Sequence, residues 1–355
     1  MTAPLNEPWD DSWVEQLVQF DEALRLGHQP ATDSSSAREL EETEEFLRRL
    51  QSIWPRQPKK LGPYTLVRSL GQGTIGPTYL VEDPADLRPF VLKVLWPELS
   101  DHAGLRRQLM YAAQTASLLR QADVAAIREV RQAGPLWMVV LPYCPGLSLA
   151  QWRRVHPHPL PWEAVAASIA QLAQTLDTVH RLATAHGDIK PSNLFLPPAE
   201  TPPSNLAEAT LRLADFGIAG AIQNARLPSR ATLAWPAPHY LAPEQLQHRT
   251  RGAEPASDLY ALGVILYELL TSRSPVTGTT REELLALVRD TTPMTPRQRR
   301  ADLPEALDAV VMSCLRHHPA ERPASAQQLA ESLRELLPEV KKESPAWWKQ
   351  WLGWM

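Results

Sequence analysis

The fold is decided by one stretch, HGDIKPSNLF, at residues 186–195. A strongly apolar helical pattern precedes this stretch, and the stretch itself ends in a short apolar run. We therefore expect a tight loop between a helix and a strand. Asp188, Lys190 and Asn193 stand two and three residues apart in this loop. Polar side chains at that spacing can converge on one spot, so the stretch predicts a functional site.

Three further motifs follow in order along the chain. In LADFGIAG, Asp215 ends an expected strand and Gly217 frees the turn after it, a placement suited to a carboxylate that binds a divalent metal. YLAPEQL contains Glu244, SDLYALGVILYELLT places Asp258 at the start of a strongly apolar helix, and HPAERPAS places Arg322 in a late loop. Each motif alone is compatible with a structural role, but the ordered set is not expected by chance.

A glycine-rich stretch and a lysine in a strand precede the central loop. GQGTIG contains Gly71, Gly73 and Gly76 and lies between two β-rich runs, so we expect a hairpin whose backbone amides close over phosphates. Glycines in a hairpin are, by themselves, typical of ordinary turns. Lys93 lies in the apolar run FVLKVL, where it is either an edge lysine on a half-buried strand or an ammonium directed at nucleotide phosphates.

The secondary-structure pattern predicts an α+β fold with two lobes. Short β-rich runs begin at Tyr64 and helices dominate after Gly146. A small β-rich lobe with one helix, at about residues 63–145, therefore precedes a larger and mainly α-helical lobe at about 146–337. The two lobes together form the predicted domain, residues 63–337.

Two segments flank this domain. Residues 1–62 contain 12 acidic and 7 basic residues and two amphipathic helical patterns, which predict an acidic helical extension. The extension either packs on its own chain or docks a partner. Residues 338–355 form a Trp-rich tail in which Trp347, Trp351 and Trp354 would share one helical face beside Lys349, a pattern that suits a membrane interface, a partner groove or a return onto the larger lobe.

Composition excludes several classes of protein. The formal net charge is −4 and no basic stripe is present, so we expect no nucleic-acid partner. Glu268 interrupts the longest apolar run, so we expect no transmembrane segment. Cys144 and Cys314 lie far apart in unrelated patterns, which indicates neither a disulfide framework nor a zinc site. A cytoplasmic location is expected from this cysteine usage.

The ordered motifs resemble those of the eukaryotic-type, or Hanks-type, serine/threonine protein kinases of bacteria. The resemblance implies a bilobal protein-kinase-like fold that uses ATP and Mg²⁺. It implies that Lys93 holds the α and β phosphates and that Asp188 accepts the proton of the substrate hydroxyl. Lys190 would contact the transferring phosphoryl group, and Asn193 and Asp215 would bind magnesium.

The resemblance also assigns the connection between the lobes. Leu141 would gate the back of the nucleotide pocket, and Pro142 would offer its carbonyl to the adenine amino group. Cys144 would supply the backbone N–H of the next adenine contact, which a proline cannot supply. Small-molecule kinases of the aminoglycoside and choline type are a distant alternative, because they lack the APE segment and the late arginine.

Three further residues match supporting positions of the family. Glu244 and Arg322 resemble its buried ion pair, which fixes the segment before the substrate groove. Asp258 resembles the acid at the start of a helix that braces the catalytic loop. We interpret these three residues as structural.

The sequence departs from the family pattern at three places. Gly187 replaces the usual arginine of the catalytic loop, so no guanidinium is available there for a phosphorylated activation segment. Ala237 stands where the family tends to have a threonine. Between Asp101 and Asp123 there is no acidic residue, although the family expects a glutamate in this helix to pair with the strand lysine.

The missing glutamate leaves the partner of the strand lysine open. Gln108 or Gln114 would supply a neutral hydrogen bond, or Asp215 would pair with Lys93. The sequence therefore favours a serine/threonine protein kinase that transfers the γ-phosphoryl group of ATP to an unknown protein substrate, weakened or atypically regulated. The alternative is a pseudokinase that binds nucleotide or acts as a scaffold.

Overall fold

A computed structural model provides the coordinates. It describes residues 60–86, 88–119, 123–182, 184–198, 203, 205–225, 238–247, 254–278 and 281–338. Most of the predicted acidic extension, the Trp-rich tail and Ala237 lie outside the described residues. Within this part of the chain no helix is long and apolar enough to cross a bilayer.

The smaller lobe is built on an antiparallel sheet with strand order β1-β2-β3-β4-β7-β6. Its strands are β1 (Lys60–Leu61), β2 (Tyr64–Gly73), β3 (Gly76–Glu82), β4 (Pro89–Val94), β6 (Glu129–Ala133) and β7 (Leu136–Pro142). Side chains alternate between the two faces of a strand. In β4, Phe90, Leu92 and Val94 are buried on one face, so Lys93 lies on the other face, on a central strand of the sheet.

Two helices connect β4 to the next strand. They are α3 (Pro97–Ser100) and α4 (Ala103–Ala116). The ring Nδ1 of His102 accepts the Leu105 N–H at 3.0 Å and caps the start of α4. Leu105 and Leu109 are fully buried on the inward face of the helix.

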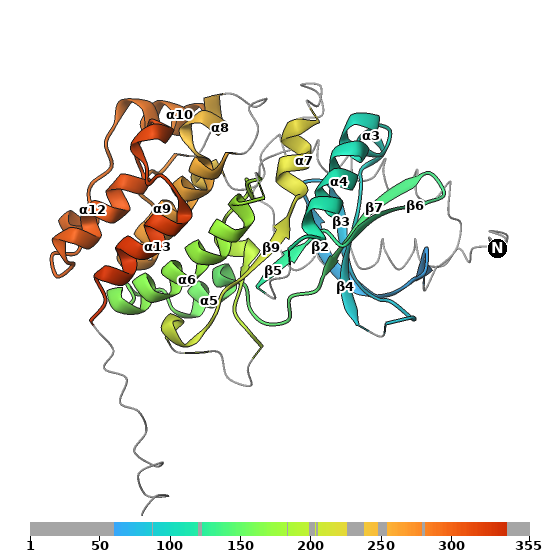
Figure 1. The fold of residues 1–355 in the computed structure, drawn as a ribbon, viewed down its shortest axis with the longest axis horizontal. Helices are drawn as coiled ribbons and strands as arrows, with labels where there is room; N and C mark the ends of the chain where they lie inside the picture. Colours follow the sequence, from blue (N-terminus) through green and yellow to red (C-terminus); the bar gives the residue numbers. More distant parts are fainter. Residues whose placement is uncertain are drawn as a thin grey trace, which may run out of the picture.

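The larger lobe is mainly helical, as predicted. Its helices are α5 (Leu149–Val155), α6 (Trp162–His180), α7 (Ile218–Asn224), α8 (Pro243–Gln247), α9 (Pro255–Thr271), α10 (Arg281–Asp290), α11 (Pro296–Arg299), α12 (Glu305–Cys314) and α13 (Ala326–Glu335), with short 3₁₀ turns at Pro191–Asn193, Leu206–Glu208, Pro238–Tyr240 and Pro319–Glu321. Helix α9 is buried along 14 of its 17 residues, so it forms the axis of this lobe. Figure 1 shows the two lobes side by side, with α7 next to α4 between them.

A second, three-stranded sheet lies where the lobes meet. It contains β5 (Val124–Ala126), β9 (Arg212–Phe216) and β8 (Leu194–Phe195) in the order β5-β9-β8, and β5 runs parallel to β9. The run AIREVRQA, at residues 126–133, is divided between the two sheets. Ala126 pairs with Phe216 in the small sheet, whereas Glu129 begins β6 in the large one. The chain changes sheets within the run because its two apolar ends have different partners.

The crossing of α9 and α12 generates a stability prediction. A Cβ atom added at Gly263 would lie 2.5 Å from the Cβ of Cys314, so the two helices would have to separate. Gly→Ala in a helix normally stabilises by about 0.5–1 kcal/mol. For Gly263→Ala we expect instead a loss of about 1–3 kcal/mol from overpacking. Urea unfolding measures it.

Gly220→Ala on α7 is the matched control, because the nearest atom to its added Cβ is 3.9 Å away. We expect no loss of stability there. A Gly263→Ala protein as stable as the parent would contradict the close helix contact.

Candidate functional site

The glycine-rich hairpin lies close to the strand lysine. Gly71 and Gly76 have φ values of 115° and 147°, which only glycine adopts readily. A Cβ at Gly76 would lie 1.7 Å from the carbonyl oxygen of Val94. A Cβ at Gly73 would lie 4.0 Å from the Nζ of Lys93, so the turn passes next to the ammonium. The predicted phosphate-binding elements are therefore adjacent.

Lys93 forms an ion pair with Asp215. Its Nζ donates to Oδ2 of Asp215 at 2.7 Å, and the side chains are only 12% and 25% exposed. Burial by itself would raise the pKa of Asp215, but the charge and hydrogen bond of Lys93 outweigh it and hold that pKa below its usual value. Asp215 has a φ of 66°, a backbone conformation that costs a non-glycine residue on the order of 1–3 kcal/mol.

The three polar residues of the central loop converge. Lys190 donates from Nζ to Oδ2 of Asp188 at 2.7 Å. Asn193 donates from Nδ2 to the same carboxylate oxygen at 3.0 Å and to the Asp188 carbonyl at 2.8 Å. One carboxylate oxygen of Asp188 therefore receives two donors, while the side chain remains 26% exposed.

The loop is anchored on α9 through Asp258. This carboxylate, 1% exposed, accepts the backbone N–H of His186 at 2.7 Å and that of Gly187 at 2.8 Å. His180, at the end of α6, lies 2.9 Å away through Nε2. The structure thus brings Asp258 against the loop and not against the reacting side chains.

A second buried carboxylate pairs with Arg322. Oε1 of Glu244 accepts from one guanidinium nitrogen at 2.7 Å and Oε2 from the other at 2.8 Å. Ser257 donates to Oε1 at 2.8 Å. Burial alone would raise the pKa of Glu244, yet Arg322 and Ser257 hold it below the ordinary glutamate value.

The connection between the lobes lies beside β9. Leu141, in β7, is 1% exposed, and Pro142 ends that strand opposite Phe90. Cys144 is buried in a small cluster with Ala214, the residue before Asp215. Burial raises the pKa of its thiol, so the group is not reactive by ionisation.

The oxygen atoms present suit magnesium. Asn193 uses its NH₂ group on Asp188, which leaves its carbonyl oxygen as an acceptor, and Asp215 uses one carboxylate oxygen on Lys93. Among the described residues no group of three or more His, Cys, Asp or Glu side chains could hold a metal without further ligands. Magnesium typically binds one or two protein oxygens together with substrate phosphates, so the pair fits that ion.

Comparison with known proteins assigns the family. A model of the protein kinase domain matches residues 64–333. The chain belongs to the protein kinase family. The resemblance noted in the sequence is confirmed.

The relatives are bacterial serine/threonine kinases. PknD of Mycobacterium tuberculosis (strain H37Rv) is 32% identical over 286 residues, 80% of this chain and 41% of PknD. Pkn1 of Myxococcus xanthus is 29% identical over 281 residues, 79% of this chain and 39% of Pkn1. The chain thus spans less than half the length of these relatives.

A solved structure shows the same fold. The crystal structure of the M. tuberculosis PknI kinase domain has a TM-score of 0.58 and 26% identity, and the match covers 78% of this chain and 97% of that one. The predicted fold class is confirmed.

Within the kinase domain, the structure identifies the α4 residue that faces the DFG motif. A Cβ added at Gly217 would lie 3.2 Å from the Cβ of Ala112, so Ala112 is the inward residue at this level of the helix. Gln114 is exposed. Among the described residues, neither Gln108 nor Gln114 makes a hydrogen bond to Lys93. The apolar spacing of Leu105, Leu109 and Ala112 indicates that Ala112 faces inward, but the sequence alone does not show which inward residue lies at the level of the DFG motif.

Sequence reasoning also missed α7, which begins directly after the DFG glycine. Ile218 and Ala221 are buried in one apolar cluster with Leu105 and Leu109 of α4. Figure 1 shows the two helices packed side by side. The apolar run IAGAI was the available signal, since it places apolar residues at helical spacing after the turn.

The Glu244–Arg322 pair generates a pH-dependent prediction. Glu244→Gln leaves a buried guanidinium without its carboxylate, so we expect a loss of about 3–5 kcal/mol near neutral pH. The native pKa of Glu244 is depressed, so the stabilisation is present above the ordinary glutamate pKa and is lost as pH falls through the native value. The difference between parent and variant should therefore shrink in acid.

Urea unfolding over a pH series tests this expectation. Glu335→Gln is the control, because its side chain is exposed on α13. A difference that stays constant in acid, or that matches the control, would contradict the role of the buried pair.

Proposed function

We propose that this chain is a serine/threonine protein kinase that transfers the γ-phosphoryl group of ATP to a protein hydroxyl. The observation that supports it most directly is the convergence of Lys190 and Asn193 on Asp188. Similarity to bacterial serine/threonine kinases supports the same activity. We propose residues 63–337 as the catalytic domain, which agrees with the extent of the family match. We also propose a cytoplasmic location.

Asp188 is the proposed base. Its Oδ2 is engaged by two donors, and among the described residues no hydrogen bond is made to Oδ1, so Oδ1 is the oxygen that would receive the substrate proton. As that proton moves to Asp188, a bond forms between the substrate oxygen and the γ-phosphorus, and the bond to the leaving ADP oxygen breaks. Lys190, 2.7 Å from Asp188, would place positive charge beside the transferring group.

The nucleotide would be held by the elements around Lys93. Backbone amides of the glycine hairpin and the Lys93 ammonium would contact the phosphates, and the chain at Leu141 to Cys144 would contact the adenine. Magnesium, bound by the oxygens of Asn193 and Asp215, would neutralise charge on the phosphates.

We further propose that Asp215 takes over the part of the missing α4 glutamate. The 2.7 Å ion pair orients the lysine, and the contact between Ala112 and Gly217 links α4 to the same turn. A hydrogen bond to a charged group contributes about 1.5–3 kcal/mol. If all of that energy acts in the transition state, loss of the glutamate lowers the rate of phosphoryl transfer by at most about one to two powers of ten.

The second candidate function is a pseudokinase. It is favoured by the engagement of Asp215 with Lys93, because the ammonium then occupies an oxygen that would otherwise be free for metal. Such a protein would bind nucleotide, or would act through its contacts alone.

An assay with Asp188→Asn separates the two functions. The substitution keeps the shape of the side chain and removes the base, so we expect transfer from labelled ATP to a generic basic protein to fall by about 10²–10⁴. Asp302→Asn, at a side chain 65% exposed, should label like the parent.

If the parent labels nothing with either magnesium or manganese, the kinase proposal fails. Thermal stabilisation by ATP then distinguishes a nucleotide-binding pseudokinase from a scaffold. Equal labelling by the parent and Asp188→Asn would contradict the assignment of the base.

Ala112→Glu tests the proposed lysine partner. The new side chain restores the family's acidic residue, but it would enter the packed contact with Gly217 and α7. We expect a lower kcat and a stability loss of about 1–3 kcal/mol from overpacking.

Gln114→Glu also adds a carboxylate to α4, at an exposed position, and is expected to leave kcat and the melting temperature unchanged. A higher kcat for Ala112→Glu would show that the site prefers a glutamate and would refute the Asp215 proposal.

A further inference from the structure

A cavity of about 550 Å³ lies in the larger lobe, on the side of α12 that faces α10. It is bounded by α9, α10, α12 and the loop at residues 291–295. None of the predicted site residues lines it. Cavities of about 300–1,000 Å³ are typical of ligand sites, so it is large enough for a bulky side chain.

The cavity contains two polar groups without protein partners. The Tyr260 side chain is 4% exposed, and its hydroxyl makes no hydrogen bond within the described part of the chain. Burial raises its pKa to about 12, so the hydroxyl is neutral and both donates and accepts. Nδ1 of His317 is also buried and unpartnered. Of the two atoms, only Nδ1 of His317 is fully buried; a buried polar atom without a partner costs about 1–3 kcal/mol, which an occupant that donates to it would recover.

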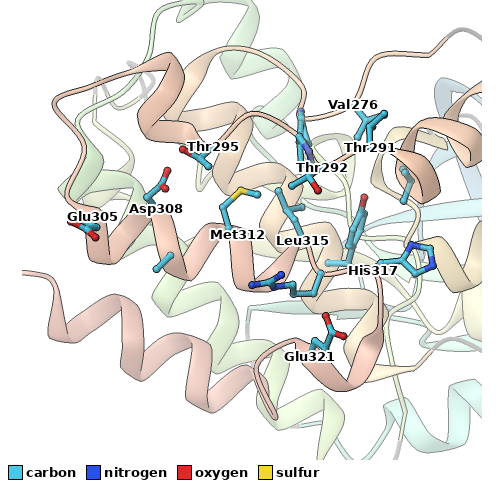
Figure 2. A pocket seen from close by; sticks show the side chains of 16 residues that line it. Val276, Thr291, Thr292, Thr295, Glu305, Asp308, Met312, Leu315, His317 and Glu321 are labelled. Atoms are coloured by element: carbon cyan, nitrogen blue, oxygen red, sulfur yellow. The ribbon is translucent and has the colours of Figure 1, made fainter.

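The walls of the cavity combine apolar and acidic side chains. Figure 2 shows Met312, from α12, and Leu315, just after its end, along the middle, with Glu305 and Asp308 at one end and His317 at the other. Three carboxylates line the cavity against one guanidinium. The chemistry that fits is a large aromatic ring with one N–H donor, next to a cation. Tryptophan beside lysine has both properties.

The chain itself contains such a segment. Residues 339–355 include WWKQWLGWM, with four tryptophans and Lys349 between them, and two further lysines precede it. The described chain ends at residue 338, just after α13, and α13 contacts α12. Seventeen residues extend by up to about 55 Å, so the cavity is within reach.

We propose that this cavity binds the Trp-rich segment at residues 339–355 of the same chain. A tryptophan ring would lie on Met312 and Leu315, and its indole N–H would donate to the Tyr260 hydroxyl or to His317. The neighbouring lysine would face the carboxylates of Glu305 and Asp308. The proposal does not depend on phosphoryl transfer, so it can be tested in the full-length chain whether or not the enzyme is active.

Hydrogen exchange provides the first test. The variant replaces all four tail tryptophans, W347A, W348A, W351A and W354A, and it changes no residue of the described fold. If the segment occupies the cavity, amide exchange in the loop at 291–295 and in α12 should become about tenfold faster, equivalent to ~1.4 kcal/mol of lost protection. The control replaces two tryptophans of the other terminus, W9A and W13A, and should leave these amides unchanged. Unchanged exchange in the tail variant would overturn the proposal.

Photocrosslinking provides the second test and identifies the occupant. A benzophenone side chain in place of Met312 should cross-link within one chain to a peptide from residues 339–355. The same group in place of Val155, which is 67% exposed on α5, should not. A cross-link between two chains, to the N-terminal segment, or to no part of the tail would each refute the proposed intramolecular docking.

Discussion

One buried carboxylate, Asp258, holds the catalytic loop in place. It projects from α9, the most buried helix of the larger lobe, and it accepts the backbone N–H groups of His186 and Gly187. A buried carboxylate is costly without donors, and here the two amides and His180 compensate it. The position of Asp188 is therefore set by the core of the lobe, one residue after the anchored amides.

His186 links this loop to the metal side of the site. Its Nδ1 accepts the N–H of Asp188 at 3.2 Å, so Nε2 is the protonated nitrogen and donates to the Ala214 carbonyl at 2.8 Å. Ala214 precedes Asp215 in β9. The His186 imidazole thus fixes the spacing between the catalytic loop, which carries Asp188, and β9, which carries Asp215. This arrangement places both carboxylates through backbone contacts, which side-chain substitutions elsewhere disturb little.

The sequence predicted the parts of the site that depend on local chemistry. Asp188, Lys190 and Asn193 lie within six residues, and a polar cluster in a short loop has few ways to fold. The partner of Lys93 was left open, because the apolar pattern indicates the inward face of α4 but not which inward residue lies at the level of β9. Helix α7 was missed for a similar reason: its stability comes from burial against α4, and seven residues have little helical tendency alone.

The contact between α4 and α7 bears on how the proposed kinase is controlled. A glutamate on α4 would act on Lys93 through charge, with a contribution of about 1.5–3 kcal/mol. Full burial of an isoleucine contributes a similar amount, about 1.5–3 kcal/mol, and Ile218 is 7% exposed against α4. The apolar contact can therefore match the energy that the missing glutamate would contribute, but unlike a charge pair it depends little on salt or pH.

With Gly187 in place of an arginine, a phosphate added to the activation segment has no guanidinium to bind at the catalytic loop. Under the proposed arrangement, control would act by covering or uncovering the apolar face of α4, which changes little with salt or pH.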